Sequence, residues 1–412
     1  MPNFISLLCN TLIMKRITVF LLLGLAGYTI VSSCKKVQPS APANEAILDG
    51  PVEGLTPAQN IIFLRGDVAF NDEIFTSETG LGPIFVATSC GSCHAGDGKG
   101  HPFSTLTRFG QTDSTGNKYL TKGAPQLQHR ALPGFEPEKL PEGATFTRLM
   151  PPANTGVGYL EAVTDQDLLA MSDPTDADGD GISGTVNWIP IKNYINLQDG
   201  AVTKNGKCIG RFGKKAGAYN LMQQTASAYN QDMGISSLYE PIDTYTGLEI
   251  DPEVSTQTLN DVVFYLQTLK APIQRNPTHP DVVAGKQLFV QADCAKCHKP
   301  ELKTGYSPIA PLSYQSFYPY TDMLMHDMGP GLDDGYTEGM ATTAEWRTPA
   351  LWGLGLSKNS QGGSYFLLHD GRAHSIQDAI MLHGGEATNS RNKYNALPES
   401  DKKKMLTFLE SL

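Results

Sequence analysis

Two copies of one short cysteine motif carry the clearest chemistry in this sequence of 412 residues. The motif residues are Cys90, Cys93 and His94 in the first copy, and Cys294, Cys297 and His298 in the second. Cys-x-x-Cys-His is the attachment signature of c-type haem, because two thiols three residues apart can add to the two vinyl groups of one porphyrin. The adjacent imidazole is then placed to ligate the iron. We therefore expect two covalently bound haem c groups, with His94 and His298 as iron ligands.

Other uses of paired cysteines agree less well with these motifs. A thioredoxin-like redox pair needs no histidine directly after it, and a zinc site needs four ligands from the neighbourhood of each motif. Three cysteines lie outside the motifs: Cys9 leaves with a leader segment, Cys34 follows that segment, and Cys208 is expected to be a buried free thiol.

A secretion signal is expected at residues 1–33. Lys15 and Arg16 form a positive region, and the 15 residues 17–31 are mostly apolar. This stretch is short for a bilayer span, which needs roughly 20 residues, and typical of a signal peptide. Small residues before Cys34 resemble the bacterial lipobox, in which the cysteine is acylated and becomes the mature N-terminus. Ordinary secretory cleavage, with Cys34 incidental, is the alternative.

Export defines the expected location and partners. With residues 34–56 as a tether, the chain is expected in the periplasm or cell envelope, held by a lipid anchor, with the outer membrane as the expected membrane. Its 42 acidic and 32 basic residues leave a net charge of −10. This charge favours a basic redox partner such as a small cytochrome, or a cupredoxin. Because the sequence has no basic stripe, no nucleic-acid partner is expected.

The composition predicts long loops around a modest core. The chain has 41 Gly and 27 Pro, while hydrophobic residues make up 40%. Gly and Pro at this density interrupt regular elements, and strand signals are sparse. The expected fold class is mainly α with long loops.

Apolar residues at helical spacing predict the helices that position the motifs. One helix is expected to end ahead of Pro272, because proline ends helices, and residues 214–231 are a further candidate. Gly285 and Phe289 lie four apart on a short helix before the second motif, and a C-terminal helix is expected with Ser400 as its N-cap. By analogy, a Gly-bearing helix that packs on a C-terminal helix closes cytochrome c folds. The apolar positions are Leu259, Val262, Val263, Leu266 and Leu269 in the first helix, and Met405, Phe408, Leu409 and Leu412 in the last.

A linker at residues 274–280 marks the expected domain boundary, since it contains two prolines and follows a predicted helix. The interpretation is an N-terminal haem domain at residues 57–272 and a C-terminal cytochrome c-like haem domain at residues 273–412.

An acidic loop is predicted to bind calcium. Asp176, Asp178 and Asp180 alternate along the chain and Gly181 follows. This pattern brings hard oxygen ligands onto one ion. Counted from Asp176, position 12 is Asn187, where an EF-hand has glutamate, so the loop is not a full EF-hand. A solvated acidic turn is the alternative.

The two motifs and several longer segments together resemble the bacterial di-haem oxidoreductase family, some members of which are labelled thiol oxidoreductases. More distantly, the chain is similar to the di-haem cytochrome c peroxidases and MauG. The resemblance runs from about residue 50 to the C-terminus. It implies two cytochrome c-like haem domains, a calcium ion near their interface, and an electron-transfer haem that feeds a peroxidatic haem. The segments are residues 85–90, 156–163, 176–184, 232–235, 319–331, 345–349 and 369–372.

The resemblance also implies a second ligand for the C-terminal haem. His383 stands where the related peroxidases have a methionine ligand. Ser375 begins a capping-box-like pattern, and Ile376, Ile380 and His383 are expected to share one helix face, whereas Met381 lies off that face. Imidazole in place of a thioether lowers a haem's reduction potential. The high potential that the related peroxidases give to their C-terminal haem is therefore not assumed for this chain.

The second ligand of the first haem stays open. Asp232 lies near the position of an acidic residue in the related peroxidases, where a carboxylate takes and returns the proton when peroxide is split. Met233 is the competing candidate, as a distal ligand that closes the iron. Both residues are also compatible with a simple turn before Gly234.

Other side chains are candidates around the haems. Arg347 is predicted to bind a haem propionate, because its planar fork matches a carboxylate. Trp346 and Trp352 are either electron relays or aromatic packing against the porphyrins. His326 and His369 are expected to form hydrogen bonds in loops.

The leading hypothesis is an exported, peroxidase-like di-haem enzyme that passes electrons from the C-terminal haem to the N-terminal haem, with hydrogen peroxide as the oxidant. One alternative is a non-enzymatic electron-transfer cytochrome with both irons six-coordinate. Another is a MauG-like oxidase of a protein partner. A high-spin ferric signal indicates an open iron and therefore favours the enzyme. Its absence in every redox state favours the electron-transfer cytochrome.

Overall fold

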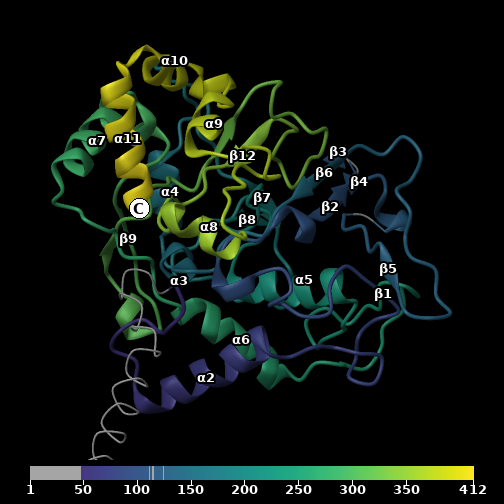
Figure 1. Cartoon of the computed structure of the whole chain (residues 1–412). Coiled ribbons are helices and arrows are strands. Elements are labelled where there is room, and N and C mark those ends of the chain that lie inside the picture. The colour runs from purple at the N-terminus through teal and green to yellow at the C-terminus, as the bar shows by residue number, and fades with distance from the viewer. Residues whose placement is uncertain (1–47, 111, 114–115, 124) are drawn as a thin grey trace, which may run out of the picture. The chain divides into compact units, whose positions relative to one another are not determined.

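The computed structural model describes residues 48–412, apart from residues 111, 114–115 and 124 (Figure 1). The expected signal peptide and Cys34 lie outside the described residues. The described end of the expected tether is packed: Val52 is buried with Ile309 and Leu312, and its backbone N–H donates to the Thr268 carbonyl at 2.7 Å. Part of the segment expected as a tether is therefore packed against the rest of the chain, since Val52 belongs to it.

Helices carry most of the regular structure. They are α2 (Pro57–Asn71), α3 (Val157–Glu161), α4 (Asp165–Met171), α5 (Leu221–Met233), α6 (Thr256–Thr268), α7 (Pro280–Gln291), α8 (Ser357–Ser360), α9 (Ile376–Met381), α10 (Thr388–Ala396) and α11 (Glu399–Ser411). Among the described residues, none of these helices combines the length and apolar character of a membrane span.

The strands of the described residues form small antiparallel pairs. The pairs are β1 (Ile84–Phe85) with β5 (Arg130–Ala131), β2 (Leu106–Phe109) with β6 (Phe146–Leu149), β3 (Thr112–Asp113) with β4 (Gly116–Asn117), β7 (Trp188–Pro190) with β8 (Lys207–Ile209), β9 (Leu302–Lys303) with β10 (Ser316–Phe317), and β11 (Met325–Asp327) with β12 (Glu345–Arg347). The fold is thus mixed. Strands of two to four residues are too short to leave an alternating pattern in the sequence.

The predicted helices occur, with shifted ends. α6 buries Leu259, Val262, Val263 and Leu266 as expected. α5 begins only at Leu221, because the Asn220 side chain caps it by accepting from the Gln223 N–H at 2.9 Å. The C-terminal helix begins after Pro398, so Ser400 lies inside its first turn and is not the N-cap. A cap is decided by local backbone geometry, which apolar spacing does not reveal.

The two motifs follow helices built in the same way. α2 packs on α6, and α7 packs on α11 (Figure 1). A Cβ on Gly66 of α2 would lie 2.1 Å from the Asp261 carbonyl oxygen, and one on Gly285 of α7 would lie 2.1 Å from the Lys404 carbonyl oxygen. Only glycine permits either close crossing. The expected packing of a Gly-bearing helix on the C-terminal helix is confirmed, and the first half contains a second example that the sequence analysis missed.

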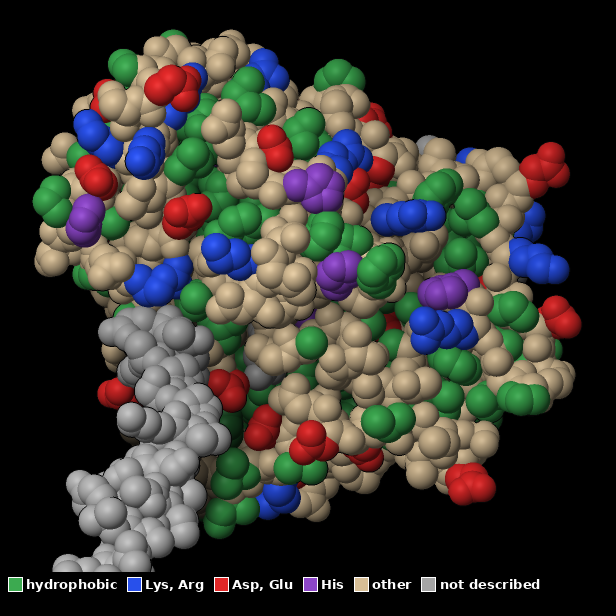
Figure 2. Space-filling view, viewed as in Figure 1, with side chains coloured by type: hydrophobic (Ala, Val, Ile, Leu, Met, Phe, Trp, Pro, Cys, Tyr) green, Lys and Arg blue, Asp and Glu red, His purple; other side chains and the backbone are tan. Residues whose placement is uncertain are grey.

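Two hydrophobic clusters support these helix pairs. The larger cluster contains buried residues of α2, α5 and α6, whereas the second contains buried residues of α7 and α11. By chain contacts, residues 47–412 form one compact unit. The boundary between an N-terminal haem domain ending at residue 272 and a C-terminal one starting at residue 273 stays a prediction. On the face in Figure 2, acidic and basic side chains are interspersed, so the net charge is not gathered there.

Candidate functional site

One cavity of about 590 Å³ brings the two cysteine motifs together. All six motif residues line it, although the motifs are 204 residues apart in the sequence. The four motif cysteines are free thiols. Burial raises the pKa of Cys90 and of Cys294 to about 12. These thiols are therefore neutral, and they line the cavity.

Each motif histidine is held in the orientation that an iron ligand needs. Nδ1 of His94 lies 2.9 Å from the Pro152 carbonyl oxygen, and Nδ1 of His298 lies 3.0 Å from the Tyr320 carbonyl oxygen. A carbonyl only accepts, so Nδ1 donates in both cases and Nε2 keeps a free lone pair. Burial lowers the pKa of each imidazole to about 4, so both are neutral.

The same aromatic contact supports both histidines. Phe70 of α2 lies 5.9 Å from His94 between ring centroids, and Phe289 of α7 lies 6.3 Å from His298. Each phenylalanine is four residues after the glycine that permits its helix crossing. A Gly-x-x-x-Phe spacing before both motifs was the sequence signal for this repeat.

His383 lines the cavity that contains His298. It lies just past the end of α9, so the prediction that it shares the helix face was wrong in detail. Its Nδ1 is 2.6 Å from the Ala379 carbonyl oxygen, four residues back, which leaves Nε2 free. Burial is the main cause that lowers the pKa of His298, and the neighbouring His383 is the second. The two rings therefore interact electrostatically. Met381 is 39% exposed and points elsewhere.

Asp232 and Met233 end α5 and both line the cavity. Burial raises the pKa of Asp232 to about 6, although the charge of Arg108 opposes that shift. Oδ1 of Asp232 is buried and has no hydrogen-bond partner among the described residues. The Asp232 charge also contributes to the raised pKa of Cys90, so it lies near the first motif. Met233 is 2% exposed and packs in the larger hydrophobic cluster.

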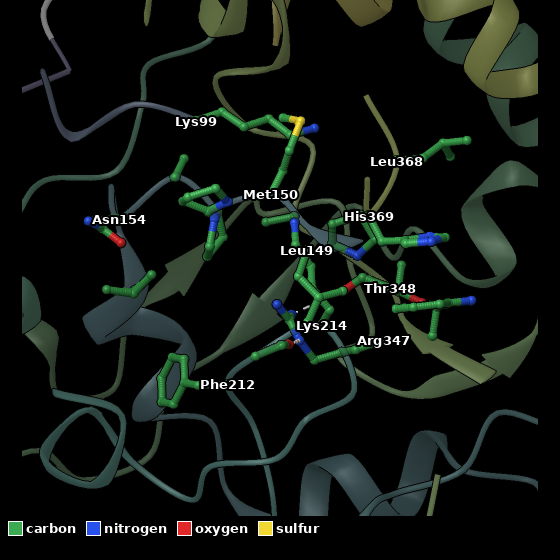
Figure 3. Close-up of a pocket in the computed structure, with 18 of the residues that line it drawn as sticks. Lys99, Leu149, Met150, Asn154, Phe212, Lys214, Arg347, Thr348, Leu368 and His369 are labelled. Atoms are coloured by element: carbon green, nitrogen blue, oxygen red, sulfur yellow. Dashed lines mark hydrogen bonds between the residues drawn. The ribbon is translucent and has the colours of Figure 1, made fainter. Parts of the chain in front are cut away.

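A group of basic side chains lines the cavity beside the first motif (Figure 3). Burial lowers the pKa of Lys99 to about 8, that of Arg347 to about 10, and that of Lys214 well below its ordinary value. Neither lysine ammonium group has a hydrogen bond or ion pair with any described residue. Arg347 donates Nε–H to the Gly213 carbonyl at 2.9 Å. All three side chains are half-buried, and anions beside them would favour their charged forms. Nothing in the sequence marks Lys99 or Lys214 for such a role.

Trp346 is fixed on both faces of its ring. His369 stacks on it at 3.7 Å with an interplanar angle of 7°, and the Lys215 ammonium nitrogen lies 3.8 Å from the ring centroid. Its Nε1–H donates to the Leu332 carbonyl at 2.8 Å. Trp346 and Trp352 both line the cavity, so relay and packing roles both stay open.

The acidic loop gathers a different set of carboxylates from the predicted one. Oxygens of Asp173, Asp176 and Asp178 lie within 4.8 Å of one another. Asp180 instead pairs with the Lys296 ammonium group of the second motif at 2.9 Å. The ion pair draws Asp180 toward the motif, an interaction between distant segments that the loop's own sequence does not contain.

Among the described residues, the one cysteine outside the motifs is Cys208, which is free and 0% exposed. It packs with Ile189 and Tyr219 outside the cavity wall. The prediction of a buried free thiol is confirmed.

Comparison with family models identifies the family of this chain. A family model described as "Di-haem oxidoreductase, putative peroxidase" matches residues 147–412. The matched region includes the second motif, Asp232 and His383, and begins after the first motif. A search of the curated proteins finds no match. A similar solved structure is hydrazine synthase of Kuenenia stuttgartiensis, pressurized with 20 bar xenon, with 14% identity and a TM-score of 0.36; the alignment covers 91% of this chain and 98% of that chain.

Proposed function

Because the chain belongs to the di-haem oxidoreductase family, we propose that it is an exported peroxidase-like enzyme with one haem c at each cysteine motif. Hydrogen peroxide reacts beside the first motif, and electrons arrive through the second haem. The observation that carries this proposal is the single cavity that both motifs line. A small basic cytochrome or a cupredoxin is the expected electron donor, since the chain is acidic.

The donor set fits two haem c groups. Each motif offers two half-buried thiols and an imidazole with a free Nε2. Lys99, Lys214 and Arg347 lie on the cavity wall, where haem propionates would favour their charged forms and pair with them. The similar helix crossings before the two motifs support two cytochrome c-like units. When bound, the haems supply redox-active iron and the path for electrons.

The chain itself provides the proton transfer. Peroxide cleavage consumes two electrons and two protons and yields two waters. Asp232 takes the proton from the attacking peroxide oxygen and returns it to the oxygen that leaves. Its buried Oδ1 without a hydrogen-bond partner supports this role. A carboxyl with a pKa of about 6 serves both steps near neutral pH.

Covalent attachment predicts two haems that denaturation does not release. Pyridine haemochrome on denatured protein is expected to give two haems per chain. Replacing Cys90 and Cys93 with serine is expected to halve that value, as is replacing Cys294 and Cys297. Cys208→Ser, which changes a buried thiol outside the cavity, is the control and keeps both haems. Haem that acid–acetone extracts from the parent contradicts the proposal.

Electron transfer without catalysis is the second candidate, because Met233 also lines the cavity. A thioether on the first iron would make both haems six-coordinate. A high-spin ferric component in the parent spectrum favours the enzyme, and its absence in every redox state favours the carrier.

We also propose a calcium ion at the acidic loop. A metal that binds only the folded chain stabilises it by about 2.7 kcal/mol at a hundred-fold excess over Kd. Calcium is therefore expected to raise the melting temperature of the parent and not that of Asp178→Ala. Asp199→Ala removes an exposed carboxylate outside the cluster and keeps the response. An equal calcium response in parent and Asp178→Ala refutes the site.

The lipid anchor at Cys34 and residence in the cell envelope remain part of the proposal. Cys34→Ser is expected to release the chain from membranes, because acylation needs the thiol, and globomycin is expected to make the precursor accumulate. Membrane fractionation and precursor mass measure the two effects. If neither changes, ordinary secretion is the better account.

A further inference from the structure

A buried row of three charged side chains lies beside the second motif. Nε2 of His326 is 2.9 Å from a carboxylate oxygen of Asp322, and Nδ1 of His326 is 2.6 Å from a carboxylate oxygen of Glu386. Nδ1 also lies 3.7 Å from Sγ of Cys297. His326 and Glu386 line the cavity together with the motif. No role proposed above uses this row.

The row carries a fixed pattern of charge. Ionised carboxylates only accept hydrogen bonds, so both ring nitrogens of His326 donate and the imidazole is a cation. Burial alone would lower the pKa of His326, but the hydrogen bonds, first that to Asp322, raise it to about 12. Burial likewise opposes ionisation of Glu386, but the bonds from His326 and Ser183 bring its pKa to about 2. One cation between two anions leaves the row with one net negative charge.

Glu386 joins three segments of the chain. One carboxylate oxygen accepts from Ser183 Oγ at 2.7 Å and from the Asp327 N–H at 3.2 Å. The other accepts from the Ser183 N–H at 3.1 Å and from His326. Ser183 ends the acidic loop, His326 and Asp327 belong to β11, and Glu386 follows His383 by three residues.

The backbone holds the same turn in place. A Cβ on Gly385 would lie 2.1 Å from the Asp327 carbonyl oxygen, and Gly385 has φ +49°. Only glycine allows this approach of the turn to β11 without strain. At the other end of the row, Asp322 lies two residues after Tyr320. The Tyr320 carbonyl accepts a hydrogen bond from His298 and so orients its ring. The row therefore lies between the segment that orients His298 and the turn that carries His383.

We propose that His326 and Glu386 are positioning residues for the second haem: they hold the turn that carries His383 in register with His298, and their charge contributes to that haem's reduction potential. This inference rests on the proposed function, in which His298 and His383 ligate one iron. His326 is not itself a ligand, because both of its ring nitrogens are occupied.

The test is Glu386→Gln, which keeps the shape of the side chain. Glutamine has one acceptor oxygen and a donor amide, so it cannot accept from all four donors and removes the negative charge. Ferric spectra are expected to gain a high-spin component at one haem. At a fixed potential, the ferrous-to-ferric ratio of that haem is expected to rise on the order of ten-fold, because a nearby negative charge that favours ferric iron is lost. A ten-fold change corresponds to about 59 mV.

Controls separate this effect from general damage. Glu240→Gln removes a carboxylate bonded to Tyr194 at 2.6 Å that does not line the cavity, and it is expected to change neither haem. If Glu386→Gln does not fold, His326→Gln is the second variant. Glutamine has one donor nitrogen in place of two, so it cannot bridge both carboxylates as the imidazole does. It is expected to give the same high-spin component. Unchanged spectra and potentials in whichever of these variants folds overturn the inference. If His383→Ala also leaves both spectra unchanged, the ligand assignment itself fails; if His383→Ala alone produces high-spin iron, only the positioning role fails.

Discussion

Replacing Asp232 with asparagine is expected to lower kcat/KM for hydrogen peroxide about 10²–10⁴-fold while both haems stay bound. The amide has the shape of the carboxylate but cannot take a proton. The orphaned oxygen of Asp232 is buried on the wall of the cavity near the first motif. Stopped-flow kinetics and haem content measure the two parts of this prediction.

The pH profile identifies the group responsible. Because burial raises the pKa of Asp232 to about 6, the carboxylate that accepts the peroxide proton forms between about pH 5 and 7, so the parent rate is expected to rise over that interval. Asp232→Asn is expected to lose this step. Asp251→Asn, an exposed carboxylate, keeps it. A step near pH 6 that persists in Asp232→Asn assigns the proton transfer to another residue.

Met233→Leu tests the competing role at the same site. If the thioether closes the first iron, leucine opens it, and a high-spin component and faster peroxide reaction appear. If Met233 only packs in the hydrophobic cluster, the haem spectra stay as in the parent. The second result is expected, because Met233 is almost fully buried while Asp232 presents an unpaired oxygen.

The second large effect is expected from His383→Ala, which converts one low-spin haem to high-spin. His383 has a free Nε2 and shares the cavity with His298, and loss of an imidazole leaves the iron five-coordinate. His383→Met keeps six ligands and raises the potential of that haem, since axial methionine raises it. Electron paramagnetic resonance and redox titration measure these outcomes.

Met381→Ala is the matched control for His383. Met381 is two residues away, partly exposed and absent from the cavity wall, so the variant is expected to keep both parent spectra. If His383→Ala leaves spectra and potentials untouched, the ligand lies elsewhere. Met328 on the cavity wall is then the next residue to replace, whereas His326 is excluded by its two carboxylate contacts.

Sequence alone determined the features whose cause is local. Two thiols and an imidazole in five consecutive residues define a haem motif wherever the chain places them. The buried face of α6 followed from apolar spacing, and the Ser375 cap of α9 from a pattern of four residues; Ser375 accepts from the Asp378 N–H at 2.9 Å. These features depend on neighbours within a few residues, so their physical origin is contained in the local sequence.

Only the tertiary structure decided which distant residues meet. Lys99 and Lys214 line one cavity wall although 115 residues separate them. Asp180 leaves the predicted acidic cluster because Lys296 attracts it, and Glu386 reaches His326 and Ser183 from two other segments. Long loops carry many of these residues, and loop paths are set by packing and long-range hydrogen bonds, not by periodic local patterns. The motifs are therefore local properties of the chain, whereas the single cavity that joins them exists only in the folded protein.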